Sequence, residues 1–128
     1  PAAATNARRI EGGLLFSGTD FDHSVTPFAA GLGSLVDLEK SEFVGRAALA
    51  QADKSRRTWG LQCTDGIARH GDSLFINGDC AGRVCSSAWS PYLQCGIAIV
   101  RMTDPAPGPG TELQVECVDG RTGILSLR

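Results

Sequence analysis

Glycine, asparagine, aspartate and proline divide the second half of the chain into short segments, and this spacing limits what it can fold into. Alternating apolar and polar residues predict strands over residues 58–64, 73–76, 83–87, 94–102, 111–118 and 122–127. Asn77-Gly78 and Asp119-Gly120 have the composition of tight hairpin turns. The proline-rich residues 104–110 form a loop, since proline has no amide to donate to a ladder. Six short strands with such turns are typical of a small antiparallel barrel or sandwich.

Residues 1–54 have a different pattern, which mixes helix and turn signals. A first helix is expected over about residues 3–11. Ser41 is a candidate N-cap for a second helix that runs to about Lys54, because apolar residues recur there at helical spacing. Between the two helices, residues 34–38 alternate like a strand. The sequence therefore predicts an α+β chain with two unequal parts.

Composition and charge exclude several classes of function. The chain has 128 residues, of which 42% are hydrophobic, enough for one domain with its own core. The net charge of −2 leaves no basic excess for a nucleic-acid surface, so no nucleic-acid partner is expected. No stretch approaches the roughly 18 apolar residues that a spanning helix needs, so no membrane partner is expected either.

The five cysteines have no metal-binding pattern. They are Cys63, Cys80, Cys85, Cys95 and Cys117. No C-x-x-C occurs, and His23 and His70 are the only histidines, so no metal site is expected. Both histidines are expected on solvated loops. Most of the cysteines fall in apolar runs, as expected for reduced, packed thiols of a cytoplasmic protein.

Six blocks of sequence, taken in order, resemble one protein family. The first three are RRIEGGLL at residues 8–15, followed by Gly18 and Asp20, then TPFAAGLG at residues 26–33 and FVGRAAL at residues 43–49. The other three are GRVCSSAWSPYL at residues 82–93, GIAIV at residues 96–100 and GTELQV at residues 110–115. Together they resemble the C-terminal part of the folate-dependent aminomethyltransferases, the family of the glycine cleavage T-protein and the tetrahydrofolate-dependent demethylases. Arg8 is more typical of the demethylase-like members.

The resemblance implies a role in one-carbon transfer to or from tetrahydrofolate. In the family, the folate lies in a central cavity between three domains, and the key acidic residue belongs to the N-terminal domain. This chain lacks that region, so the resemblance implies no catalytic residue here. One-carbon transfer depends on positioning the donor against the folate nitrogen. We therefore expect an isolated chain to be inactive.

Two residues of the first block are candidates for contact with folate. The resemblance implies that an arginine near Arg9 contacts the glutamate tail of folate, with Glu11 beside it. A guanidinium suits a carboxylate because it forms two parallel hydrogen bonds. The alternative, which we favour for both residues, is an internal Arg–Glu pair that holds the helix against its sheet.

Three residues of the second half are further candidates for cofactor binding. Arg69 resembles the arginine of a turn at the start of the family's barrel. Contact with folate and stabilisation of the turn remain equally open for it. Trp89 and Tyr92 flank a Ser-Pro turn and could stack on a flat ligand. Covering the end of the barrel core is the alternative, and we favour it.

These observations predict a remnant of a central α+β domain followed by a small antiparallel six-stranded β-barrel. Residues 1–54 would end the central folate-binding domain, and residues 55–128 would form the barrel. The expected partner is the N-terminal region, or a chain that supplies it, and uncovered apolar faces could also cause self-association. The alternative function is a non-catalytic docking or scaffold subunit. The one-carbon donor cannot be inferred from these residues.

Overall fold

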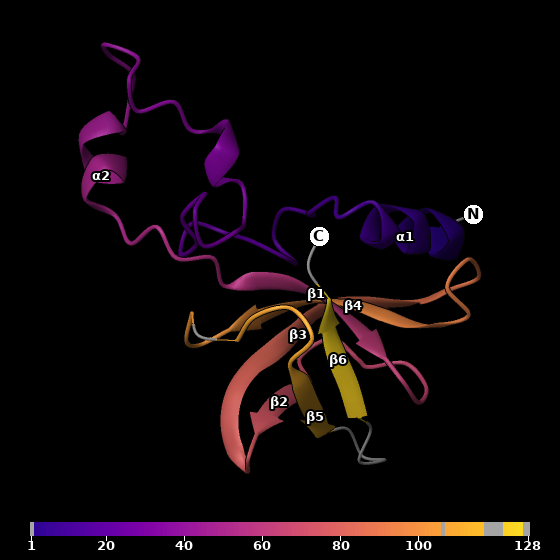
Figure 1. Cartoon of the computed structure of the whole chain (residues 1–128). Helices are drawn as coiled ribbons and strands as arrows, with labels where there is room; N and C mark the ends of the chain where they lie inside the picture. The colour runs from indigo at the N-terminus through magenta and orange to yellow at the C-terminus, as the bar shows by residue number, and fades with distance from the viewer. Residues whose placement is uncertain (1, 106, 117–121, 127–128) are drawn as a thin grey trace.

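The computed structural model describes residues 2–105, 107–116 and 122–126 of the chain. Its helices and strands, in chain order, are α1 (Ala2–Glu11), the 3-10 helix η1 (Gly33–Leu35), α2 (Arg46–Gln51), β1 (Thr58–Cys63), β2 (Ser73–Ile76), β3 (Asp79–Ser90), β4 (Cys95–Met102), β5 (Glu112–Glu116) and β6 (Thr122–Ser126). The strands form one sheet, α1 lies across it, and α2 stands away from it (Figure 1). This arrangement confirms the α+β class.

All the pairings in the sheet are antiparallel, in the order β1-β4-β3-β2-β5-β6. β6 pairs in turn with β1, with Gly60 opposite Ser126, so the sheet closes on itself. Asn77 and Gly78 join β2 to β3 with φ angles of 51° and 86°, as the sequence predicts for this turn. The second predicted turn, at residues 119–120, and Cys117 lie outside the described residues.

The interior of the closed sheet is an apolar core. It contains Leu61, Cys63, Ala68, Leu74, Val84, Ala98, Val100, Met102 and Leu113. In β4 the alternate residues Ile97 and Ile99 are also buried, but they belong to a second cluster on the outer face. The unbroken apolar run of β4 is therefore explained by burial on both faces of the strand.

Helix α1 covers that outer face. Ala7 and Ile10 lie one helical turn apart and are the buried residues of α1. Ile10 packs with Cys85, Ile97 and Ile99. Asn6 adds a polar contact, because its side-chain Nδ2 donates to the carbonyl oxygen of Ser87 at 3.0 Å. The helix is thus attached to β3 and β4 along one face.

Two predictions for the first half are wrong. The second helix begins at Arg46 rather than near Ser41, and it ends at Gln51. Gly45 has a φ of 87°, a left-handed conformation that an α-helix cannot continue through. The strand expected at residues 34–38 is replaced by the 3-10 turn η1, because no neighbouring strand offers it a ladder in the described part of the chain.

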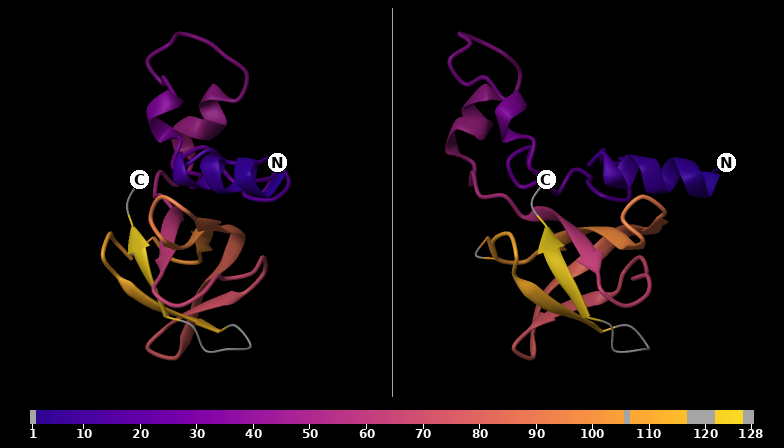
Figure 2. Two further views of the ribbon diagram at one scale, coloured as in Figure 1. Left: turned by 90° about the vertical axis from the view of Figure 1, so that its right-hand side faces the viewer. Right: turned by 45° about the vertical axis from the view of Figure 1, so that its right-hand side comes forward.

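Residues 31–55, hereafter the arm, project away from the closed sheet (Figure 2). The base of the arm is fixed, since the amides of Arg57 and Thr58 both donate to the carbonyl oxygen of Ala29. Further out, some of the apolar side chains are uncovered. Leu35 is 79% exposed, Val44 is fully exposed, and α2 has no buried residue.

Among the described residues, no helix has the length and apolar character that crossing a bilayer requires.

The close packing at Gly96 gives a first prediction. A Cβ added to Gly96 would collide with the carbonyl oxygen of Gly66, whereas a Cβ at Gly108 would meet nothing within 4 Å. We expect Gly96→Ala to lower the free energy of unfolding by about 2 kcal/mol, because a packed backbone must move. Urea denaturation followed by circular dichroism measures this. The matched Gly108→Ala variant should stay within about 0.5 kcal/mol of the parent, and equal stability of the two variants would contradict the packing.

Candidate functional site

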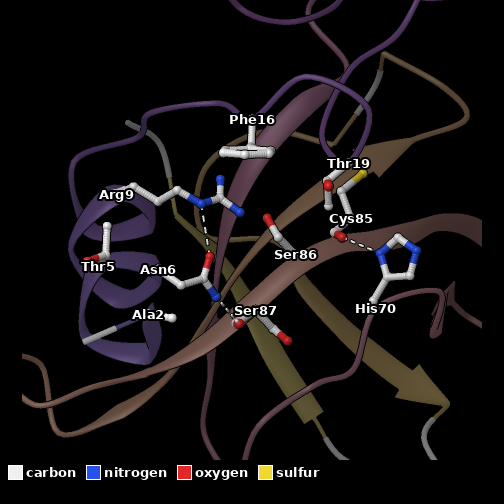
Figure 3. A pocket seen from close by; sticks show the side chains of 10 residues that line it. All are labelled: Ala2, Thr5, Asn6, Arg9, Phe16, Thr19, His70, Cys85, Ser86 and Ser87. Atoms are coloured by element: carbon white, nitrogen blue, oxygen red, sulfur yellow. Dashed lines mark hydrogen bonds between the residues drawn. The ribbon is translucent and has the colours of Figure 1, made fainter.

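The main candidate site is a cavity of about 560 Å³ between α1, the loop that follows it and the outer face of β3 (Figure 3). Its lining includes Arg9 and Asn6 from the helix, Phe16 from the loop, and His70 and Cys85 from the barrel. The sequence singled out Arg9 in this group, while Phe16, His70 and Cys85 were not recognised as its neighbours. Segments about 60 residues apart in the sequence meet here.

Arg9 is held rigidly at the edge of this cavity. Its Nη1 donates to Asp20 Oδ2 at 2.6 Å and to the carbonyl oxygen of Leu14 at 3.1 Å. Its Nε donates to Asn6 Oδ1 at 2.9 Å. The guanidinium also lies under the ring of Phe16, with 5.4 Å from its Cζ to the ring centroid (Figure 3). Only 16% of the side chain remains exposed, so Arg9 is fixed before any ligand arrives.

Asp20 is the residue that fixes Arg9, and its side chain is fully buried. Besides Arg9, its Oδ2 accepts from the amide of Phe16 at 2.8 Å, and its Oδ1 accepts from the hydroxyl of Ser86 on β3. Its backbone carbonyl accepts from Nη2 of Arg101 on β4 at 2.6 Å. One residue therefore connects α1, the loop and two strands. The sequence blocks included Asp20, but spacing alone did not identify it as the partner of Arg9.

Glu11 faces a different part of the barrel. It lies 3.6 Å from Nη1 of Arg8 and accepts from the hydroxyl of Ser90 at 2.6 Å. The internal pair considered for the first block thus has other members: Arg9 pairs with Asp20, and Glu11 with Arg8. Ser90 Oγ also accepts from the amide of Leu93, so Glu11 supports the turn between β3 and β4.

The remaining candidates lie at the surface and are not part of the lining of the cavity at Arg9. The side chain of Arg69 is exposed, and its backbone amide donates to Asp72 Oδ2 at 2.6 Å in a turn. Trp89 and Tyr92 are 45% and 83% exposed. Neither ring belongs to the two apolar clusters of the described residues, so the interpretation that they cover the end of the barrel core stays a prediction.

His70 and Cys85 form the barrel side of the cavity. The ring Nδ1 of His70 is hydrogen-bonded to the carbonyl oxygen of Cys85 (Figure 3). Burial raises the pKa of the Cys85 thiol; the positive charges of Arg101 and Arg83 oppose this shift, and the carboxylates of Asp20 and Asp22 add to it. Cys85 is therefore a neutral thiol at physiological pH. Among the described residues, no group of histidine, cysteine or carboxylate side chains could hold a metal ion.

Comparisons with known proteins identify the barrel. Residues 56–124 match the family model of the glycine cleavage T-protein C-terminal barrel domain. The chain belongs to this family. The family predicted from the six blocks is thereby confirmed for the C-terminal portion of the aminomethyltransferases.

Relatives of this family match almost the whole chain. The aminomethyltransferase of Synechococcus sp. (strain WH7803) is 44% identical over 118 residues, which cover 88% of this chain and 32% of that protein. A probable aminomethyltransferase of Natronomonas pharaonis is 41% identical over 119 residues, covering 88% and 33%. The crystal structure of glycine cleavage system aminomethyltransferase T from Bartonella henselae superposes with a TM-score of 0.85 at 26% identity, covering 99% of this chain and 37% of that one. The chain thus spans about a third of the length of these relatives.

The buried ion pair gives a second prediction. Asp20→Asn should lower the free energy of unfolding by about 3 kcal/mol, because it leaves a largely buried guanidinium without a charge partner. Chemical denaturation measures this. Arg8→Gln is the matched control, since the side chain of Arg8 is 82% exposed and its pair with Glu11 should contribute less than about 1 kcal/mol. Similar losses in both variants would show that Asp20 does not connect the elements as described.

The thiols give a third prediction. At about pH 8, iodoacetamide should modify Cys80 first, because Cys80 is exposed while Cys63 and Cys85 are buried. Cys85 should react slowly until the chain unfolds, since its raised pKa also keeps it protonated. Peptide mapping by mass spectrometry over time gives the order. Labelling of Cys85 as fast as Cys80 in the folded chain would contradict its burial.

Proposed function

We propose that this chain is the C-terminal third of a tetrahydrofolate-dependent aminomethyl- or methyltransferase. In this proposal residues 55–128 form the family's six-stranded closing barrel, and residues 1–54 end the central α+β domain. The key acidic residue would come from the region that precedes these residues in the relatives. The proposed location is the cytoplasm, in keeping with five cysteines and no described disulfide.

The uncovered arm is the observation that carries this proposal. Leu35 and Val44 stand in solvent, and no side chain of α2 is buried. Exposed apolar groups gathered on one segment mark a missing contact surface. About two thirds of the length of each relative lies outside the part that this chain covers, and that remainder is a natural source for the missing surface. Without it, the same exposed groups would favour self-association.

The cavity at Arg9 is proposed as one wall of the folate site. Arg9 offers a positive charge that Asp20 and Asn6 hold in position, and Phe16, which is 60% exposed, adds an aromatic ring. A positioned guanidinium suits a carboxylate of the folate tail, and an exposed ring suits a flat ligand. Arg69, Trp89 and Tyr92 remain proposed contacts because their side chains are exposed. Glu11 is proposed to act indirectly, through the turn that Ser90 holds.

When bound in an assembled enzyme, tetrahydrofolate would accept or donate the one-carbon unit. The residues of this chain would contribute only binding and orientation. Arg9 would neutralise a carboxylate at the rim of the cavity, and the buried contacts of Asp20 would keep that charge in place. The neutral Cys85 thiol would form part of the wall. None of these residues is proposed to move a proton.

A docking or scaffold subunit is the second candidate. The closed sheet with its own apolar core favours it, since such a barrel can fold without further sequence. A scaffold of this kind would stay monomeric and would bind little of a dye specific for hydrophobic surface. An incomplete enzyme would bind the dye through the arm.

A chimera tests the proposed function and gives a fourth prediction. The chain alone should show no saturable binding of tetrahydrofolate at micromolar concentrations by calorimetry. Placing the first two thirds of the Synechococcus sp. (strain WH7803) aminomethyltransferase before it should restore binding. Arg9→Gln in the chimera should weaken that binding by about tenfold, the effect expected for one charged contact to a carboxylate.

The controls separate the two functions. Arg8→Gln in the chimera should bind like the parent, because the side chain of Arg8 lies in solvent. A folded chimera that binds no tetrahydrofolate would refute the proposed enzyme. Saturable binding by the chain alone would show that the cavity at Arg9 is sufficient by itself.

A further inference from the structure

Two arginines lie side by side on the outer face of the barrel, outside the cavity at Arg9. Arg83 of β3 and Arg101 of β4 are directly opposite each other in the antiparallel pair. Side chains in this relation share one face of the sheet, with Cβ atoms about 5 Å apart. Two like charges in this position repel each other and destabilise the pairing. A bound anion between the two guanidinium groups would relieve this repulsion.

The nearby carboxylates are already engaged. Asp20 forms its ion pair with Arg9, and it offers Arg101 only a backbone carbonyl. Asp22 lies close enough to feel both arginines electrostatically, but it is exposed and accepts hydrogen bonds from the amide and hydroxyl of Ser24. Neither of these two aspartates forms an ion pair with Arg83 or Arg101 in the described part of the chain.

The guanidinium of Arg101 has unused donors. Its Nη2 donates to the carbonyl of Asp20, but its Nε is buried and has no hydrogen-bond partner among the described residues. A buried charged donor without an acceptor costs free energy that a bound acceptor would recover. The backbone of Arg83 pairs within the sheet, but its side chain makes no hydrogen bond within the described ranges, so all of its guanidinium donors are available.

A cavity of about 360 Å³ lies beside the pair. Arg83 and Arg101 both line it, together with Ser73, Thr103 and the backbone around Gly82. This lining shares no residue with the cavity at Arg9. The space is ample for a phosphate or carboxylate group, and no acidic residue lines it.

We propose that Arg83 and Arg101 form a binding site for an oxyanion of the phosphate or carboxylate class. Guanidinium groups bind both anions through paired N–H donors, with better geometry than a lysine ammonium. The site is independent of the proposed folate wall, because it uses other side chains in another cavity. Either proposal can therefore fail without the other.

Nuclear magnetic resonance of the arginine side chains tests this site and gives a fifth prediction. Sodium phosphate is titrated into the ¹⁵N-labelled chain, with sodium chloride at matched ionic strength as the reference and sodium acetate as a second arm. We expect saturable shifts of the Arg101 Nε–H signal and of the backbone amides of Arg83 and Arg101. A larger response to phosphate than to acetate would assign the ligand to the phosphoryl class, and the reverse would assign it to the carboxyl class.

Variants make the result specific. Arg83→Gln should weaken binding by about fivefold, which corresponds to about 1 kcal/mol, and it breaks no described hydrogen bond. Arg8→Gln removes the same charge from α1 and should bind like the parent. Arg101→Lys keeps the positive charge but removes the paired N–H donors of the guanidinium, so it should also weaken binding. Shifts that follow ionic strength alone, or unchanged binding by Arg83→Gln, would overturn the proposal.

Discussion

The buried carboxylate of Asp20 is the interaction on which the rest of the structure depends. It accepts from Arg9 of the helix, from the amide of Phe16 in the loop and from Ser86 of β3. A carboxylate without solvent is tolerated only when it is paired and its oxygens are hydrogen-bonded. Asp20 meets this condition only if helix, loop and sheet are all in place. The same contacts that stabilise the fold therefore also orient the charge at the candidate site.

The closed sheet and the arm differ in how far their apolar side chains are buried. In the sheet, β4 is buried on both faces, by the barrel core and by α1. In the arm, Val44 is fully exposed and Leu35 is largely exposed. A barrel can bury its own core because closure leaves no free edge. A six-residue helix such as α2 cannot bury its apolar side chains by itself, because most helical stability comes from packing against another element. This contrast is why the function is proposed for an assembled protein and not for the barrel alone.

The two arginine environments of this chain differ in their counter-charge. Arg9 has a buried carboxylate at 2.6 Å and serves as a fixed feature of the cavity wall. Arg83 and Arg101 are cross-strand neighbours without a carboxylate bound between them. The first arrangement is held in position by an ion pair within the fold, while the second retains unused donors and has no such ion pair in the described part of the chain.

The sequence predicted an element correctly where the residues of that one strand or turn were sufficient to specify its structure. Alternation and turn residues predicted β1, β2, β4 and the Asn77-Gly78 turn, and the six blocks predicted the family. It failed for the arm, where Gly45 delays the start of α2 and no strand of the described sheet pairs with residues 34–38.

The site was only half predictable. Arg9 could be named from its block, but its partner Asp20 lies 11 residues away and is brought to it by the loop. The positions of His70, Cys85 and Ser86 beside α1 depend on contacts between segments more than 60 residues apart in the chain. Sequence patterns report local preference and the face that a residue occupies. Which charges meet, and which are left without a partner, is decided only when the sheet closes and α1 is packed upon it.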